Sequence, residues 1–249
     1  MHARPSGHVA LLTDFGERGP AAGLLRAAVL RGHGKAVSFD LGHTVPPHDV
    51  DDGAFWLWSA IGRVPNGTAV VAGVGDLAAV TRWLVVAAHQ AFWLGPDNGV
   101  LSHVFAGDPE VEVRSIDVAN LNLRPAGGDG ASAVLAPVAA WLGGGRYGFS
   151  ALGPRVADPV RLPPLFEGAT RVVHVDGHGN LVTNVRAEAS LEALQAGGRR
   201  VARRSAIALV PGELVAQVGS HGLWEIAQPG GHAARALGVA RGAPVVVHP

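Results

Sequence analysis

Short apolar runs alternate with helix-like segments through the first part of the chain. His8–Thr13 is an apolar run that ends in a polar turn, which is typical of a buried strand. Over residues 19–30 the apolar positions recur at helical spacing, and Pro20 suits the first turn of a helix. The same reading predicts strands over 36–41, 68–72, 83–88 and 91–94, and helices over 50–61 and 131–142. This alternation predicts an α/β domain with a mostly parallel sheet that is covered on both faces.

The pattern changes after about Gly153. Four prolines follow within residues 154–164, and each removes a backbone donor and fixes φ, which is linker chemistry. Short β-like pieces then occur at close spacing: 170–175, 181–185, 205–209, 213–218, 223–227 and 244–248. We therefore expect an α/β domain over 1–155, a proline-rich linker over 156–168 and a small all-β, barrel-like domain over 169–249.

The composition narrows the classes of function. The 249 residues are 48% hydrophobic and 16% charged, which is enough apolar material for packed cores. Lysine plus arginine and aspartate plus glutamate balance at 20 each, so no nucleic-acid partner is expected, and residues 199–204 are interpreted as a short charged turn. No cysteine is present, which excludes disulfides and cysteine nucleophiles. With no apolar signal core or membrane span, a cytoplasmic location is expected.

Asp14 is the first candidate for chemistry. It follows a predicted strand and opens a glycine-containing turn, and open α/β sheets bind ligands at the carboxyl ends of their strands. A carboxylate can accept two hydrogen bonds at once, which suits a ribose diol. The alternative is that Asp14 caps the helix that begins near Pro20. The motif alone leaves both interpretations open.

Two further turns carry polar residues. Residues 176–180 (Asp-Gly-His-Gly-Asn) lie between two predicted strands and could line a cleft or form a plain hairpin turn. Residues 95–99 (Gly-Pro-Asp-Asn-Gly) are a strong turn signal and are interpreted as architecture. The glycine-rich loop over 73–76 lacks the spacing and the lysine of a phosphate loop.

The sequence patterns support neither a metal site nor the site of a serine hydrolase. His43 and His48, with Asp49 and Asp51, form the tightest His/Asp group, but HExxH spacing is absent and no second pair closes a tetrahedral site. We therefore expect no metal. The Gly-x-Ser-x-Gly pattern of a nucleophile elbow is also absent.

Taken together, the chain resembles one family over nearly its whole length. The matching segments are 11–16 (Leu-Leu-Thr-Asp-Phe-Gly), 43–50 (His-Thr-Val-Pro-Pro-His-Asp-Val) with 53–55 (Gly-Ala-Phe), 95–102 (Gly-Pro-Asp-Asn-Gly-Val-Leu-Ser), 135–140 (Leu-Ala-Pro-Val-Ala-Ala), 176–184 (Asp-Gly-His-Gly-Asn-Leu-Val-Thr-Asn) and 219–227 (Gly-Ser-His-Gly-Leu-Trp-Glu-Ile-Ala). In order and spacing they are similar to the S-adenosylmethionine hydroxide adenosyltransferases, relatives of fluorinase and chlorinase.

The resemblance implies a site and a reaction. Asp14 would bind the ribose hydroxyls, Asp176 the methionine ammonium and Asn180 the adenine, while Ser220 and His221 would bind the methionine carboxylate. Water or hydroxide would attack C5′ of the sulfonium, giving adenosine and L-methionine, with no cofactor. The family assembles as homotrimers, with the ligand between the N-domain of one subunit and the C-domain of the next. The implied partner is therefore S-adenosylmethionine or a nucleoside, with no nucleic acid and no membrane.

The departures from the family pattern fall on catalytic positions. Family hydrolases carry Asp-Pro-Gly-Val-Gly followed by an arginine, but here the segment over 72–75 is Ala-Gly-Val-Gly and only Arg82 lies near the arginine's place. Gly130 stands where a histidine is expected, and Gly19 where a second ligand-binding aspartate is expected.

Losing such positioned groups typically costs ~10²–10⁴-fold in rate. The candidates to replace them are Asp76, Asp129 and His178. His178 stands where relatives usually have an aromatic residue, so it could equally fill a packing role. Two functions therefore stay open: a hydrolase with replaced groups, and a catalytically weak or inactive homologue that binds S-adenosylmethionine or adenosine as a sensor or scaffold.

Overall fold

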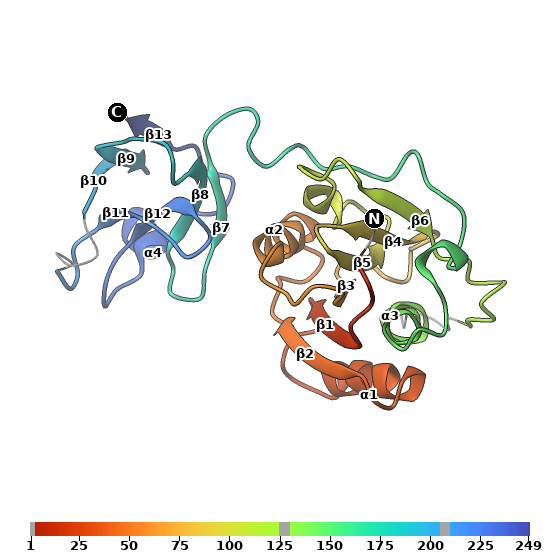
Figure 1. Ribbon diagram of the computed structural model, residues 1–249. Coiled ribbons are helices and arrows are strands. Elements are labelled where there is room, and N and C mark those ends of the chain that lie inside the picture. Colours follow the sequence, from red (N-terminus) through yellow and green to blue (C-terminus); the bar gives the residue numbers. More distant parts are fainter. Residues whose placement is uncertain (1–2, 125–129, 205–209) are drawn as a thin grey trace. The chain divides into compact units, whose positions relative to one another are not determined.

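A computed structural model describes residues 3–124, 130–204 and 210–249. The chain divides into two compact units, Met1–Leu162 and Pro163–Pro249. Figure 1 shows the elements of both units. The predicted strand over 205–209 lies outside the described residues.

The described part of unit 1 is built around one six-stranded sheet of order β2-β1-β3-β5-β4-β6. Its strands are β1 (His8–Thr13), β2 (Val37–Gly42), β3 (Ala69–Gly73), β4 (Trp83–Ala88), β5 (Ala91–Pro96) and β6 (Glu112–Ser115). β1 pairs parallel with β2 and β3, and β3 pairs parallel with β5, whereas β4 runs antiparallel to β5 and β6. The mostly parallel sheet is thereby confirmed, with an antiparallel edge.

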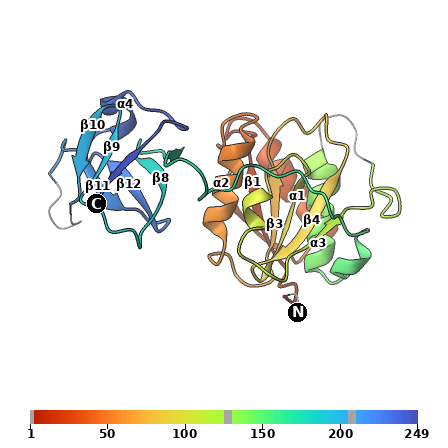
Figure 2. The ribbon, with the colours of Figure 1, turned by 90° about the horizontal axis from the view of Figure 1, so that it is seen from above.

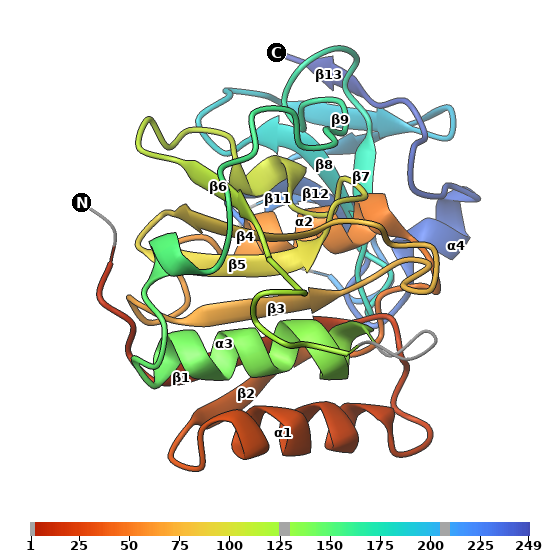
Figure 3. The same ribbon diagram turned by 90° about the vertical axis from the view of Figure 1, so that its right-hand side faces the viewer.

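The helices cover both faces of this sheet. They are α1 (Ala21–Gly32), α2 (Val50–Ala60) and α3 (Ala136–Gly143), together with a π-helical first turn before α3 (Ala131–Leu135) and 3-10 turns at Ser102–Val104 and Phe149–Ala151. Figure 3 shows the strands side by side with α1 and α3 on one face. Figure 2 shows α2 on the opposite side.

Alternation along the buried strands explains these layers. Val9 and Leu11 of β1 pack toward α1 and α3, while Ala10 and Leu12 pack into the second core, which contains Leu57 of α2. Successive side chains of a strand point to opposite faces, so a strand that is apolar at every position requires cover on both sides. That is why the continuous apolar runs in the sequence predicted this architecture.

Unit 2 contains two antiparallel sheets around one apolar core, within the residues described. One sheet has the order β10-β9-β13 and the other β11-β12-β8-β7. The elements are β7 (Val172–Val175), β8 (Leu181–Arg186), β9 (Ala193–Ala196), β10 (Arg199–Ala202), β11 (Val215–Val218), β12 (Leu223–Ala227), β13 (Val246–His248) and the short helix α4 (Ala233–Leu237). The predicted all-β second domain is confirmed.

Local expectations were wrong at several places. Residues 199–202 form strand β10, paired with β9, where a charged turn was expected. Only Val201 of that strand is buried, so its sequence carries no apolar run. β6 and β9 were also missed, because each is a four-residue strand with little pattern of its own.

Candidate functional site

Asp14 lies at the point where the strand order of the sheet reverses. β1 is followed in the chain by β2 on one side of it, and β3 then pairs on the other side. The carboxyl ends of β1 and β3 therefore meet at a topological switch point, where open α/β sheets form ligand crevices. The backbone N–H of Asp14 donates to the carbonyl of Gly73 at 3.3 Å, which joins these two strand ends.

The Asp14 carboxylate is held on one side by main-chain donors. Its Oδ2 accepts the N–H of His48 at 2.9 Å and the N–H of Gly75 at 3.0 Å. Within the described residues its Oδ1 has no partner, so this oxygen can accept hydrogen bonds from a ligand. Pro20 occupies the N-cap of α1 and no side chain caps that helix. The helix-cap interpretation of Asp14 was therefore wrong.

The turn over residues 95–99 supports this arrangement. Asn98 donates from Nδ2 to the carbonyl of Val74 at 2.9 Å, and its Oδ1 accepts the N–H of Val100. Gly75 has φ +107°, and a Cβ there would lie 2.5 Å from Asn98 Nδ2. Asn98 thus shapes the loop whose N–H binds Asp14, and only glycine fits at position 75.

Position 130, where the family resemblance leads us to expect a histidine, has no space for a side chain. Gly130 is buried, and a Cβ built on it would overlap the indole ring of Trp83, which is itself 5% exposed. A histidine side chain at position 130 would have no room, because the ring of Trp83 fills the space. The next residue, Ala131, packs near Gly73 and Thr13, so this apolar contact lies beside the end of β3.

Arg82 lies in an ion-pair network that ties residues 158–160 to the sheet of unit 1. Its Nε donates to Asp97 Oδ2, and its two Nη atoms donate to Oδ1 and the carbonyl of Asp158 at 3.1 and 2.9 Å. The other Asp97 oxygen accepts the N–H of Val160. Hydrogen bonding to Asp97 holds the pKa of Arg82 above its ordinary value. All three guanidinium nitrogens thus have protein partners.

Two other candidate replacement groups are Asp76 and Asp129. Asp76 is exposed, and its Oδ1 accepts the N–H of Ala78 in a local turn. Asp129 lies outside the described residues.

In unit 2, Asp176 and Asn180 are bound to each other. Asp176 Oδ1 accepts the N–H groups of His178 and Asn180, both at 2.9 Å, and its Oδ2 accepts Asn180 Nδ2 at 2.8 Å. These bonds organise the turn between β7 and β8, as the hairpin interpretation expects. They also hold a carboxylate and a carboxamide group side by side. The His178 side chain is exposed and its ring has no hydrogen bond within the described part of unit 2.

Ser220 and His221 lie in the tight turn between β11 and β12, closed by the Gly222 N–H donating to the Gly219 carbonyl at 3.0 Å. Glu225 of β12 lies beneath this turn and is 5% exposed. Burial raises the pKa of Glu225, and the nearby Asp176 carboxylate adds to the rise, while Gln217 donates to Glu225 Oε1 at 2.9 Å. Glu225 was not identified from the sequence, where it reads as one polar residue inside an apolar strand.

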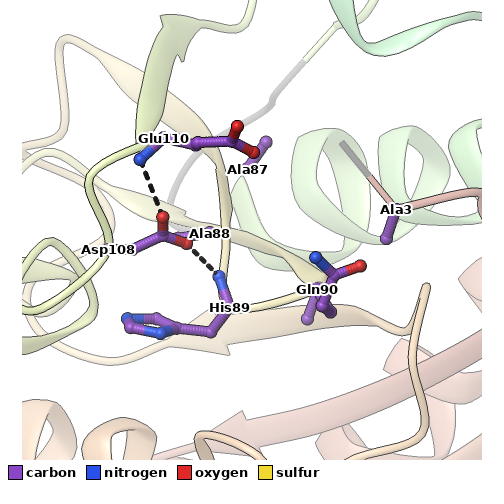
Figure 4. A pocket seen from close by; sticks show the side chains of 8 residues that line it. Ala3, Ala87, Ala88, His89, Gln90, Asp108 and Glu110 are labelled. Atoms are coloured by element: carbon purple, nitrogen blue, oxygen red, sulfur yellow. Dashed lines mark hydrogen bonds between the residues drawn. The ribbon is translucent and has the colours of Figure 1, made fainter. Parts of the chain in front are cut away.

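A small polar pocket at the other end of the strands, away from Asp14, does not belong to this site. It is lined by residues of the β4–β5 turn with Asp108 and Glu110, and has an empty volume of about 240 Å³ (Figure 4). Asp108 accepts the N–H groups of His89 and Glu110. This turn precedes β5, whereas Asp14 follows β1, so the two lie at opposite ends of parallel strands.

The described residues contain no group of three His, Asp or Glu side chains that could hold a metal ion. His43 instead contacts Thr13, and Asp49 caps α2 by accepting the N–H of Asp52. Across the same residues, no helix has the length and apolar character needed to cross a bilayer.

Comparison with known proteins agrees with this two-domain architecture. Residues 9–153 match the SAM hydroxide adenosyltransferase N-terminal domain, and residues 170–246 match the SAM hydroxide adenosyltransferase C-terminal domain. The fold defines a class of two-domain protein. Its first unit is α/β and has a carboxylate at the switch point of the sheet, and its second unit is built of β-strands. The chain belongs to the SAM hydroxide adenosyltransferase family.

Individual relatives cover nearly the whole chain. A Thermus thermophilus protein named (R)-S-adenosyl-L-methionine hydrolase is 34% identical, over 95% of this chain and 98% of its own length. A Salinispora tropica protein of the same name is 30% identical over 96% of each. The crystal structure of an uncharacterized conserved protein from Thermotoga maritima is similar with a TM-score of 0.87 at 25% identity, covering 97% of this chain and 100% of that one.

Proposed function

We propose that this protein hydrolyses S-adenosylmethionine to adenosine and L-methionine. The observation that carries the proposal is the 34% identity, over nearly the full length of both chains, to a relative named for this hydrolysis. Family membership and the held carboxylate of Asp14 support it. The relatives' name specifies the (R) form of the substrate, so the (R) form is the first candidate here and the (S) form is the comparison.

We assign the binding roles by residue. Asp14 binds the ribose hydroxyls through Oδ1, because Oδ2 is already engaged by two main-chain donors. Asp176 binds the methionine ammonium and Asn180 the adenine. Ser220 and His221 bind the methionine carboxylate, and two adjacent side-chain donors in one tight turn suit that anion.

The reaction needs little covalent chemistry from the protein. A water oxygen attacks C5′ as the C5′–S bond breaks, the attacking water releases a proton to the solvent, and methionine leaves as a neutral thioether. Since the leaving group needs no protonation, the main tasks of the site are in-line positioning and orientation of the water. Arg82 and His178 remain our candidates for the latter task, and no cofactor takes part.

The proposed assembly is a homotrimer in the cytoplasm. Its ligand sites would lie between the N-domain of one subunit and the C-domain of the next, with no nucleic-acid or membrane partner. Analytical ultracentrifugation with and without adenosine tests the trimer, and a monomer in both conditions would contradict it.

One experiment tests the function directly. The purified protein is incubated separately with (R)- and (S)-S-adenosylmethionine, adenosine release is followed by chromatography, and binding is measured by calorimetry. We expect adenosine and methionine in equal amounts above the protein-free control. Tight binding with no release would reject hydrolysis and favour the sensor or scaffold function. Absence of binding to either form or to adenosine would reject both functions.

Variants then test the residues. Asp14→Asn keeps the size of the side chain but removes its charge, so we expect weaker adenosine binding. His178→Phe introduces the aromatic residue usual in relatives, and an unchanged rate would reject His178 as a catalytic group.

A further inference from the structure

A buried chain of polar contacts ends beside Asp14. Thr13, the residue immediately before Asp14, is wholly buried at the end of β1. Its Oγ1 lies 2.8 Å from Nδ1 of His43, which is 6% exposed, and accepts the N–H of Phe15 at 3.3 Å. The hydroxyl of Thr13 is thus bonded to a side chain on one side and to the turn after Asp14 on the other.

The other nitrogen of His43 is turned to a carboxylate. Nε2 of His43 lies 3.2 Å from Asp40 Oδ1, and Arg26 of α1 binds both oxygens of Asp40. Arg26 first, and His43 in addition, hold the pKa of Asp40 below its usual value, so Asp40 is a carboxylate at neutral pH. A carboxylate next to Nε2 favours the tautomer with its proton there, which leaves Nδ1 as an acceptor.

This tautomer pairs the buried hydroxyl of Thr13 on both sides. Nδ1 of His43 accepts the hydroxyl proton of Thr13, and the Thr13 oxygen accepts the N–H of Phe15. Nε2 lies 3.2 Å from Asp40 Oδ1 as a charge contact, outside hydrogen-bond geometry. A buried hydroxyl that is paired on both sides holds one geometry, because displacement of Thr13 would break one of its two hydrogen bonds.

His43 also holds the turn through its backbone. Its carbonyl accepts the N–H of Gly16 at 2.7 Å. His43 therefore contacts the residue before Asp14 and the second residue after it, while His48 and Gly75 bind the carboxylate itself.

We propose that His43 is a positioning residue that, through Thr13 and Gly16, fixes the Asp14 carboxylate for the ribose hydroxyls of the ligand. This inference rests on the proposed function and deepens it. Asp40 and Arg26 orient the imidazole, so the network reaches from α1 and β2 to the end of β1.

The test compares ligands with and without the ribose hydroxyls. Dissociation constants for adenosine and for 2′,3′-dideoxyadenosine are measured by calorimetry for Thr13→Val and His43→Gln. Losing one buried hydrogen bond that positions Asp14 weakens adenosine binding roughly tenfold. Dideoxyadenosine binding changes by less than about twofold, because that ligand cannot use Asp14. A merely structural defect would weaken both ligands alike.

Three variants serve as controls. Thr13→Ser keeps the hydroxyl and restores adenosine binding to within about threefold of the original. His43→Asn places an amide oxygen near the position of Nδ1, so it retains more affinity than His43→Gln. Thr68→Val removes an equally buried hydroxyl, one that donates to the Pro65 carbonyl at the start of β3, and leaves both dissociation constants unchanged.

Each outcome is decisive. Unchanged adenosine binding in folded Thr13→Val and His43→Gln, or equal losses for both ligands, would overturn the role of His43 and leave the proposed function standing. If the unaltered protein binds neither adenosine nor S-adenosylmethionine, the proposed function fails and the role of His43 falls with it. If Thr13→Val does not fold, Thr13→Ser and the two His43 variants carry the comparison.

Discussion

The indole ring of Trp83 occupies the space that any side chain at Gly130 would need. Gly130 has helical φ and ψ of −59° and −30°, so alanine would normally be favoured there over glycine. Because the ring blocks the Cβ, we expect Gly130→Ala to lower the free energy of unfolding by about 1–3 kcal/mol. Gly130→His would cost at least as much. Chemical denaturation measures both changes.

Gly23 provides the matched control for this prediction. It is also helical, in α1, and a Cβ there meets nothing within 4 Å. Gly23→Ala should raise the free energy of unfolding by about 0.5–1 kcal/mol. A stabilising Gly130→Ala would contradict the overlap with Trp83.

Arg82 is expected to matter for the stability of unit 1. Asp97 is only 4% exposed, and Arg82→Met would remove its charged partner. We expect a loss of about 1–3 kcal/mol in the free energy of unfolding, because a nearly buried carboxylate is left with fewer donors. Arg155→Met, at a side chain 74% exposed, should change it by under about 0.5 kcal/mol. Equal effects of the two variants would refute the prediction.

Gly75 couples backbone conformation to ligand binding. Gly75→Ala meets Asn98 and has φ +107°, so the loop must shift and withdraw the N–H that binds Asp14. We expect adenosine binding to weaken roughly tenfold, in proportion to the lost charge-assisted hydrogen bond. Gly62→Ala has a similar backbone penalty, at φ +71°, but open space around it. That control should lose stability and keep its affinity for adenosine.

Glu225 makes stability depend on pH. Burial raises its pKa in the folded protein above the ordinary value of 4.5, so the folded state binds this proton more tightly than the unfolded chain does. The resulting stabilisation is complete below pH 4.5 and is lost as the pH rises through the raised pKa. Relative to Glu225→Gln, the unaltered protein should therefore lose stability as the pH rises.

Thermal unfolding between pH 4 and pH 8 checks this prediction. Glu225→Gln can still accept the hydrogen bond from Gln217, so the difference between the two proteins reports the ionisation. Glu213→Gln, at a side chain 42% exposed, is the control and should show no such trend. A constant difference between the unaltered protein and Glu225→Gln across the range would contradict the prediction.

Much of the fold could be predicted from the pattern of apolar positions. Strands such as β1, β4 and β5 are buried at nearly every position, so their apolar runs are long enough to recognise. β10 could not be recognised, because it lies at the edge of its sheet and buries only Val201. Its pairing with β9 depends on the tertiary structure, whereas its own residues read as a charged turn.

Part of the candidate site could likewise be predicted from the sequence, and part could not. Asp14 could be located from the sequence because it follows an apolar run and opens a glycine-containing turn. Its donors could not, since the N–H groups of His48 and Gly75 come from residues 34 and 61 positions away. The proposed roles of Asp176, Asn180, Ser220 and His221 remain predictions to be tested by binding.

The sequence by itself determined the family, the two-domain α/β-plus-β class and the strand end that carries Asp14. The tertiary structure alone decided that Oδ2 of Asp14 is engaged, that His43 holds the turn around it and that Trp83 closes position 130. The physical reason is the separation along the sequence of the residues that interact. Apolar periodicity reports whether a residue is buried, but hydrogen bonds and steric overlap between residues tens of positions apart exist only once the sheet has brought them together.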